Sequence, residues 1–232
     1  MDRLQIVKKQ VKELWIWPPG ASGNFLMMNH YGTGKEKPNN EFEVRGPVKW
    51  IPMFFNKIHA YHYLKIGHTI NQQKYEENLK RLVESPEENL AWHWVPIYLK
   101  EHLEIDQIHY ILPKPDIQWY ISFLTLVKNR TTSTYDNFIN DLLSQSKLEN
   151  LEVEYNERLQ EVNSIQTNKT NIIDYESLFL KYDDKLLEQY NLTKDIVKQY
   201  TNDNISLIEN FIKENLSKKE QEYFLPKLGA LV

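Results

Sequence analysis

Short apolar runs that end at turn residues predict four buried β-strands along the chain. The first, residues 14–17 (LWIW), stops at Pro-Pro-Gly, and the third, residues 107–112 (QIHYIL), stops at Pro-Lys-Pro. The second and fourth runs cover residues 90–94 (LAWHW) and 171–175 (NIIDY). Short and mostly apolar runs of this kind are typical of strands that are covered on both faces.

Between and after these runs, apolar residues recur at the spacing of an α-helix. The predicted helices cover residues 25–28, 72–84, 117–127, 138–143 and most of the chain after residue 175. Asp116 stands where the N-cap of the third helix belongs, and Ser133 with Asp136 has capping-box spacing before the fourth. Pro96 opens another short helix, and residues 205–212 have the clearest amphipathic pattern.

The alternation of strands and helices determines the expected fold class. It predicts an α/β protein of three layers, with a central, mainly parallel sheet and helices on both faces. We expect one domain over residues 1–232, with a long loop or insertion at about 31–70. Within it, the polar residues 31–47 predict a loop, and the aromatic-rich residues 48–66 predict a hairpin or two short strands.

Composition excludes several classes of function. The chain has 232 residues, a formal net charge of -4 and no cysteine, which excludes disulfides, cysteine-bound zinc, iron–sulfur clusters and thiol catalysis. The negative charge argues against nucleic acid as a partner. Without a signal-peptide pattern or an apolar run that spans a bilayer, we expect no membrane association and a cytoplasmic location.

Ligands of parallel α/β sheets bind at the carboxyl ends of the strands, and the loop after the first strand is the most specific of these segments. Its sequence, PPGASGN, has two glycines that allow a tight turn into the following helix. Such a turn can hold a phosphate or sulfate by backbone N–H groups and the helix dipole. No Lys-Ser/Thr follows the second glycine, so the loop is not a Walker A motif, and the alternative is an ordinary strand–helix turn.

Three segments, in the right order, resemble the sulfotransferase family of P-loop NTPase-like proteins. Ser22-Gly23-Asn24-Phe25-Leu26 resembles Ser-Gly-Thr-Thr-Leu in the family's phosphosulfate loop, and residues 173–179 (IDYESLF) resemble its late I-x-Y-E-D-L segment. Tyr200 and Asn204 also fit the C-terminal part. The resemblance implies 3′-phosphoadenosine 5′-phosphosulfate as the donor. The loop residues that would hold its 5′ end are Gly20, Ala21, Ser22, Gly23, Asn24 and Phe25.

The resemblance also suggests a catalytic base. Family members often carry a histidine after a central strand in a Thr-His-Leu-Pro segment, and Trp92-His93-Trp94-Val95-Pro96 is similar. An imidazole titrates near neutral pH and can accept the proton of an acceptor hydroxyl. The alternative is that His93 only packs between the two tryptophans.

The departures from the family pattern concern its cations. Gly20-Ala21 stands at the place of the loop Lys or Arg, and Pro113 stands at the Arg that grips the donor's 3′-phosphate. None of the five arginines falls on either position. Lys114 and Ser122 are the nearest substitutes for the 3′-phosphate contacts, although an ammonium lacks the bidentate geometry of a guanidinium. Lys128 and Arg130 are further candidate cations for the donor. The alternative is that they only neutralise the carbonyl groups at the C-terminus of the predicted helix. The family's C-terminal Gly-rich loop has no clear counterpart at residues 227–229.

The first functional hypothesis is a sulfotransferase-like protein that transfers a sulfuryl group from 3′-phosphoadenosine 5′-phosphosulfate to a hydroxyl of a carbohydrate or small molecule, without a metal. The second is a catalytically inactive member of the same fold with a binding or structural role, with protein partners or as a homo-oligomer. The loop and composition resemble divergent members of the family in phages and viruses. The second hypothesis therefore includes a virion-associated role, with the protein located in the host cytoplasm or in the virion. A kinase or other NTPase is the third, disfavoured by the missing Walker lysine.

Overall fold

The computed structural model describes residues 8–18, 20–32, 44–45, 48–50, 79–80, 82–92, 101–129, 145–165 and 167–231. Its contacts divide the chain into two compact units. Unit 1 contains residues 1–18, 31–110 and 157–172, and unit 2 contains residues 19–30, 111–156 and 173–232. The single domain expected over residues 1–232 stays a prediction.

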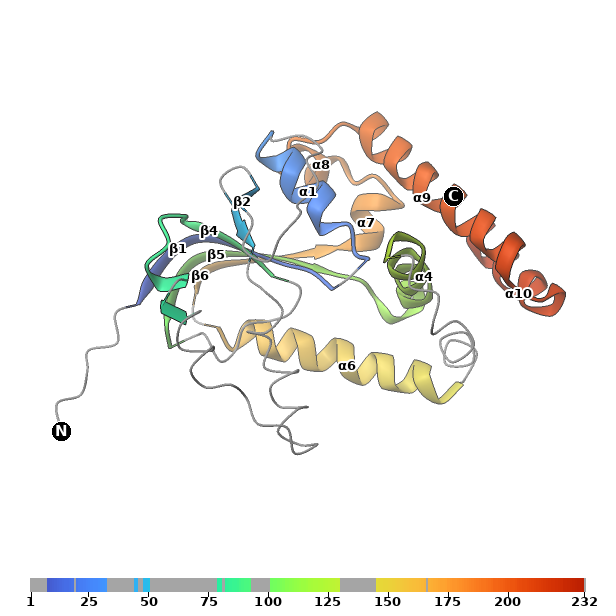
Figure 1. Cartoon of the computed structure of the whole chain (residues 1–232), viewed down its shortest axis with the longest axis horizontal. Coiled ribbons are helices and arrows are strands. Elements are labelled where there is room, and N and C mark those ends of the chain that lie inside the picture. The colour runs from blue at the N-terminus through green and yellow to red at the C-terminus, as the bar shows by residue number, and fades with distance from the viewer. Residues whose placement is uncertain are drawn as a thin grey trace. The chain divides into compact units, whose positions relative to one another are not determined.

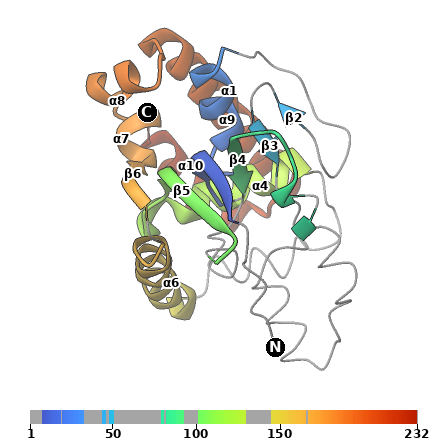
Figure 2. The same cartoon turned by 90° about the vertical axis from the view of Figure 1, so that its left-hand side faces the viewer.

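A six-stranded sheet with the order β2-β3-β4-β1-β5-β6 lies mostly in unit 1 (Figures 1 and 2). The strands are β1 (Lys9–Ile16), β2 (Val44–Arg45), β3 (Val48–Trp50), β4 (Asn89–Trp92), β5 (Leu103–Leu112) and β6 (Thr167–Asp174). β3, β4, β1 and β5 are parallel, while β2 is antiparallel to β3. The protein is therefore of the α/β class with a mainly parallel sheet, as predicted. Coverage of both faces by helices stays a prediction.

The four predicted strands are present, and three of them (β1, β5 and β6) begin four or five residues earlier than the apolar runs indicated. β1 and β5 each start with residues that alternate between buried and exposed and end with residues that are buried on both faces. The prediction found the buried ends and missed the alternating starts. β6 begins with the polar stretch TNKT. β2 lies inside residues 31–47, so the prediction of a loop throughout that segment was wrong at residues 44–45.

The two faces of the sheet differ in polarity between β1 and β5. On one face Leu14 lies beside Ile108, and Ile16 lies beside Tyr110, all of them buried. The other face carries Val11 beside Ile105 and then a row of polar residues towards the carboxyl ends of the strands. Parallel sheets are usually apolar on both faces, so this polar row needs an explanation.

Unit 2 is built from helices. They are α1 (Gly23–His30), the 3₁₀ turn η3 (Pro115–Ile117), α4 (Gln118–Asn129), α7 (Tyr175–Phe179), α8 (Asp184–Gln189), α9 (Lys194–Asn215), α10 (Lys218–Gly229), and the first part of α6 (Gln145–Asn163), which continues into unit 1. α9 and α10 pack along each other (Figure 1), and the Phe123 ring of α4 meets Phe211 and Phe224 edge-on. Ser217 and Glu220 form a complete capping box at the start of α10.

Several helix predictions can be compared with these elements. Residues 205–212 do lie in an amphipathic helix, whose buried side includes Ile208 and Ile212. Asp116 is not an N-cap, because η3 starts before α4 and Lys114 takes the cap position without a side-chain hydrogen bond. Residues 79–80 and 82–83 are helical within the predicted helix 72–84. The predicted helices at Pro96 and at 138–143 lie outside the described residues.

Candidate functional site

The loop before α1 has an unusual backbone conformation at two positions. Gly20 has φ of 82° and Ser22 has φ of 58°, both in the left-handed region, and α1 begins directly after them at Gly23. The Ser22 carbonyl accepts the first helical hydrogen bond, from the Leu26 N–H at 3.1 Å. By helix geometry, the N–H groups of the first turn point beyond the end of α1. Left-handed backbone at a non-glycine residue is strained and is concentrated at functional sites.

Close packing against α4 explains why residue 20 is a glycine. A Cβ atom built on Gly20 would lie 2.3 Å from Thr125 Oγ1 and 2.5 Å from the Ile121 carbonyl oxygen. Both distances are far below van der Waals contact, and the carbonyl belongs to the helix backbone. The loop therefore rests directly on α4, and the following residues Ala21 and Ser22 are buried.

A hydrogen bond connects the loop to the first residue of α7. Ser22 Oγ lies 3.3 Å from the hydroxyl of Tyr175, a side chain that is fully buried in unit 2. Burial raises the pKa of Tyr175 well above its usual value, and the charge of nearby Tyr120 raises it further. The Tyr175 hydroxyl therefore keeps its proton at neutral pH and holds the side chain of the strained residue.

Lys114 is engaged by carboxylates at the start of α7. Its Nζ lies 2.8 Å from Asp174 Oδ2 and 3.7 Å from Glu176 Oε2, and its side chain is 42% exposed. The hydrogen bond that Lys114 donates to Asp174 raises the pKa of Lys114, so the ammonium stays charged. Burial by itself would raise the pKa of Asp174, but hydrogen bonds from Lys114 and Ser177 bring it below the usual value. The positive charge of Lys114, which was predicted to contact a phosphate, is thus already balanced by carboxylates within the protein.

The structure brings most of the predicted site residues of unit 2 to neighbouring positions. Ser22 and Lys114 contact the consecutive residues Tyr175 and Asp174. The Phe25 ring stacks on Tyr200 with ring centroids 3.9 Å apart, and the Lys128 ammonium donates to the Tyr200 hydroxyl at 3.0 Å. Lys128 therefore contacts the ring that stacks on Phe25.

Three further predicted residues have less definite roles. Ser122 lies half-buried in α4. The Asn24 side-chain oxygen is buried and has no hydrogen-bond partner among the described contacts. His93, the predicted base, lies outside the described residues. Lys227-Leu228-Gly229 forms the end of α10.

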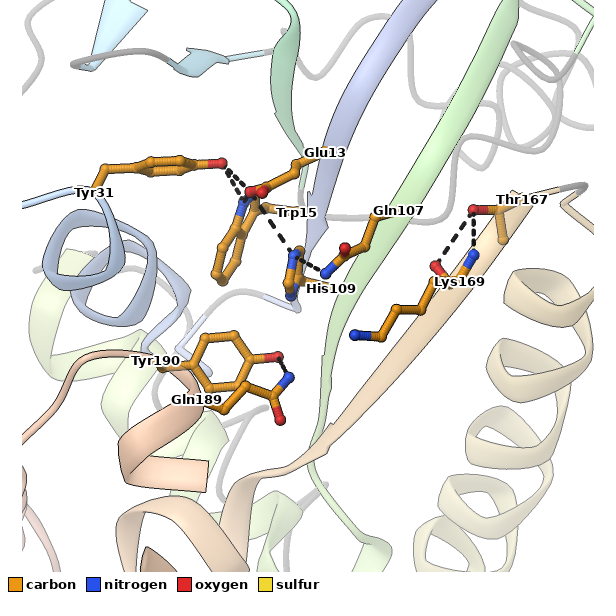
Figure 3. A network of polar contacts seen from close by, with 9 residues as sticks. All are labelled: Glu13, Trp15, Tyr31, Gln107, His109, Thr167, Lys169, Gln189 and Tyr190. Carbon is orange, nitrogen blue, oxygen red and sulfur yellow. Dashed lines mark hydrogen bonds and ion pairs between the residues drawn. The ribbon is translucent and has the colours of Figure 1, made fainter. Parts of the chain in front are cut away.

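Unit 1 contains a polar cluster that the sequence did not reveal (Figure 3). Glu13 Oε2 accepts hydrogen bonds from the Tyr31 hydroxyl and from Trp15 Nε1, the latter at 3.2 Å. Trp15 stacks on His109 with ring centroids 4.2 Å apart, and His109 Nε2 lies 3.8 Å from Glu13 Oε2. Gln107 Nε2 is 2.8 Å from the same imidazole nitrogen. We call these five residues the Glu13 cluster.

The strand register explains how the Glu13 cluster assembles. Glu13 is paired with Gln107 and Trp15 with His109 across β1 and β5, so all four side chains share one face of the sheet. Burial and the bond to Glu13 raise the pKa of Tyr31, which therefore remains a donor to the carboxylate. The sequence signal for this cluster was a pair of residues with polar groups, two positions apart, in each of two otherwise apolar strands. The sequence alone does not show that these two strands are neighbours.

The described part of unit 1 also contains a cavity of about 620 Å³ beside the first half of β5. Leu103, Ile105 and Ile165 line it together with polar residues, which include the acids Glu101, Glu104 and Asp106. None of the predicted site residues lines this cavity. It lies by the amino-terminal half of β5, whereas the predicted ligand segments follow the carboxyl ends of the strands.

Fold and contacts define the class of the protein as α/β with a parallel sheet and a strained, buried strand–helix loop. Comparison of the chain with models of known families gave no match, and no curated protein matched it. Among the helices that the structure describes, none has the length and apolar character needed to cross a membrane.

Proposed function

We propose that the protein is sulfotransferase-like and binds 3′-phosphoadenosine 5′-phosphosulfate through residues 20–25. The observation that supports this most is the loop conformation, with left-handed Gly20 and Ser22 directly before the first turn of α1. N–H groups at a helix N-terminus and in such turns are suited to phosphate and sulfate oxygens. The proposal includes the P-loop NTPase-like arrangement of three layers.

In the proposed reaction, an acceptor hydroxyl oxygen forms a bond to the sulfur of the donor. The bond between sulfur and the bridging phosphate oxygen breaks, and 3′-phosphoadenosine 5′-phosphate leaves. His93 takes the proton of the acceptor hydroxyl, and backbone N–H groups of the loop stabilise the charge on the leaving group. Lys114 and Ser122 contact the 3′-phosphate, and the acceptor is a carbohydrate or small molecule.

A catalytically inactive protein with a binding or structural role is the second candidate. Two observations favour it. Ala21 is buried at the place of the family's loop cation, and Lys114 is paired with Asp174 and Glu176. A chain of this kind would keep the fold and use other surfaces for protein partners.

Calorimetric titration with 3′-phosphoadenosine 5′-phosphate separates the two candidates. The test variant is Asn24→Asp, which adds a negative charge to the first turn of α1, where the helix dipole favours an acid. Because the Asn24 side-chain oxygen is buried, urea unfolding of the variant checks that it still folds. The control is Asn210→Asp, the same charge change at an exposed position of α9.

The first candidate predicts binding that Asn24→Asp abolishes and Asn210→Asp preserves. It also predicts release of 3′-phosphoadenosine 5′-phosphate from the donor with an added acceptor, and loss of this turnover without loss of binding in His93→Ala. Absence of binding at millimolar nucleotide contradicts it and leaves the second candidate.

A further inference from the structure

Four charged side chains form a chain of ion pairs at the start of α7. Lys114 Nζ contacts Asp174 Oδ2 at 2.8 Å and Glu176 Oε2 at 3.7 Å, and Lys181 Nζ contacts the other oxygen of Glu176 at 2.9 Å. We call these four residues the Lys114 cluster. Asp116 lies close enough to add to the negative field at Lys114. Two positive side chains thus face three negative ones.

This balance of charge bears on phosphate binding. An anion that approaches Lys114 meets two carboxylates that already occupy positions beside the ammonium. Like charges at such distances repel each other, and the lysine offers no net positive field while both pairs are formed. The ion pairs of Lys114 with Asp174 and Glu176 therefore oppose the contact that the proposed function requires.

The two carboxylates nevertheless have other partners when Lys114 leaves them. Asp174 caps α7 by accepting from the Glu176 N–H at 3.1 Å and from Ser177 Oγ at 3.0 Å. Glu176 keeps its ion pair with Lys181. Departure of Lys114 would leave neither carboxylate without a bond, and a partly exposed ion pair contributes little to stability. The exchange of partners by Lys114 is therefore inexpensive.

We propose that Asp174 and Glu176 compete with the 3′-phosphate of the donor for Lys114, and that Lys114 leaves these carboxylates for the phosphate when the nucleotide binds. This inference rests on the proposed function. The long lysine side chain carries its charge on a flexible stem, which suits a group that changes partners. The carboxylates then lower the affinity for the nucleotide and select against ligands that cannot displace them.

The test is a comparison of nucleotide affinities in Asp174→Asn. Asparagine caps helices about as well as aspartate, so the variant removes the charge beside Lys114 and retains the cap. Asp183→Asn is the matched control, because Asp183 also caps a helix of unit 2, α8, through its side chain. Calorimetric titrations use 3′-phosphoadenosine 5′-phosphate and adenosine 5′-monophosphate, which lacks the 3′-phosphate.

Competition predicts that Asp174→Asn binds 3′-phosphoadenosine 5′-phosphate about three- to fivefold more tightly than the unchanged protein, the range expected for a partly exposed ion pair. Affinity for adenosine 5′-monophosphate stays the same, Asp183→Asn has no effect, and Lys114→Ala combined with Asp174→Asn loses the gain. Glu176→Gln gives a smaller gain than Asp174→Asn, because Glu176 lies farther from Lys114.

Other outcomes identify which proposal fails. If the unchanged protein binds 3′-phosphoadenosine 5′-phosphate and Asp174→Asn binds it equally or less well, competition is overturned and the proposed function stands. An equal gain for both nucleotides, or in Asp183→Asn, also overturns competition. If neither nucleotide binds to any of these proteins, the proposed function fails and the competition fails with it. If only Asp174→Asn binds the nucleotide, the proposed function of the unchanged protein fails, and the competition that rests on it fails as well.

Discussion

Replacing Gly20 with alanine would place a methyl group where the structure has no space for one. The new Cβ would lie 2.5 Å from the Ile121 carbonyl oxygen, which cannot rotate away because it belongs to the backbone of α4. It would also lie 2.3 Å from Thr125 Oγ1. The left-handed backbone at φ of 82° adds a second cost, since a Cβ disfavours that region.

These two costs give the size of the expected effect. The backbone conformation costs an alanine about 1 kcal/mol. Overpacking against a helix costs about 1–3 kcal/mol in addition. We therefore expect Gly20→Ala to lower the free energy of unfolding by about 2–4 kcal/mol.

Urea unfolding followed by circular dichroism measures this change, and Gly32→Ala is the matched control. Gly32 also has a left-handed backbone, with φ of 66°, but a Cβ built on it meets nothing within 4 Å. The control therefore includes the conformational cost of about 1 kcal/mol and omits the overlap. The difference between the two variants isolates the packing of the loop on α4.

A second substitution tests the identity of the overlapping atoms. Thr125→Ala removes the atom nearest to the new Cβ and leaves the Ile121 carbonyl in place. Combined with Gly20→Ala, it should recover part of the lost stability. If Gly20→Ala is no more destabilising than Gly32→Ala, the close contact between loop and α4 is refuted.

Three further predictions concern hydrogen bonds and titration. Tyr31→Phe removes a donor to the Glu13 carboxylate and should lower the free energy of unfolding by about 1–2 kcal/mol in urea; a change below about 0.5 kcal/mol contradicts this role. Because the pKa of Asp174 is lowered in the folded state, its pair with Lys114 stabilises above the ordinary aspartate pKa and is lost in acid. Asp174→Asn should therefore be less stable by up to about 1 kcal/mol at neutral pH and equally stable in strong acid, and an unchanged difference in acid would contradict the assignment. Because the pKa of Tyr175 is raised in the folded state, its stabilisation is fully present below pH about 10 and is lost progressively as the pH rises from there towards the raised pKa. The phenolate absorbance of Tyr175 should appear only when the protein unfolds in alkali, and Tyr175→Phe should remove this one contribution from the absorbance change on unfolding.

Hydrophobic patterning was sufficient to predict the strands where both faces are buried. At the carboxyl ends of β1 and β5 every residue is buried and, apart from His109, apolar or aromatic, and the prediction found those ends. The starts of the same strands expose alternate residues such as Lys12 and Glu104, and short alternation of this kind is weak evidence in a single sequence. β6 begins with a stretch so polar that no pattern of burial identifies it.

The candidate loop could be placed from local sequence, but its surroundings could not. Two glycines after an apolar run predicted a turn into a helix, and α1 begins at Gly23, two residues before the predicted helix 25–28. The partners of that turn come from distant segments: Thr125 of α4 and Tyr175 of α7. Lys114 was selected for its charge, and only the structure places Asp174 and Glu176 beside it. A lysine's availability to a ligand depends on such neighbours more than on its own position.

The Glu13 cluster also depends on residues that are distant in the sequence, here through the pairing of β1 with β5. His109 is only 2% exposed, and a buried imidazole without polar partners would be costly. Its contacts with Gln107, on its own strand, and with Glu13 and Trp15 of β1 require the register that pairs Trp15 with His109. A slip of one residue would turn the side chains of one strand to the opposite face and bring Leu14 or Ile16 against the polar row. The polar row on one face therefore disfavours wrong pairings of β1 with β5 that apolar residues alone would tolerate.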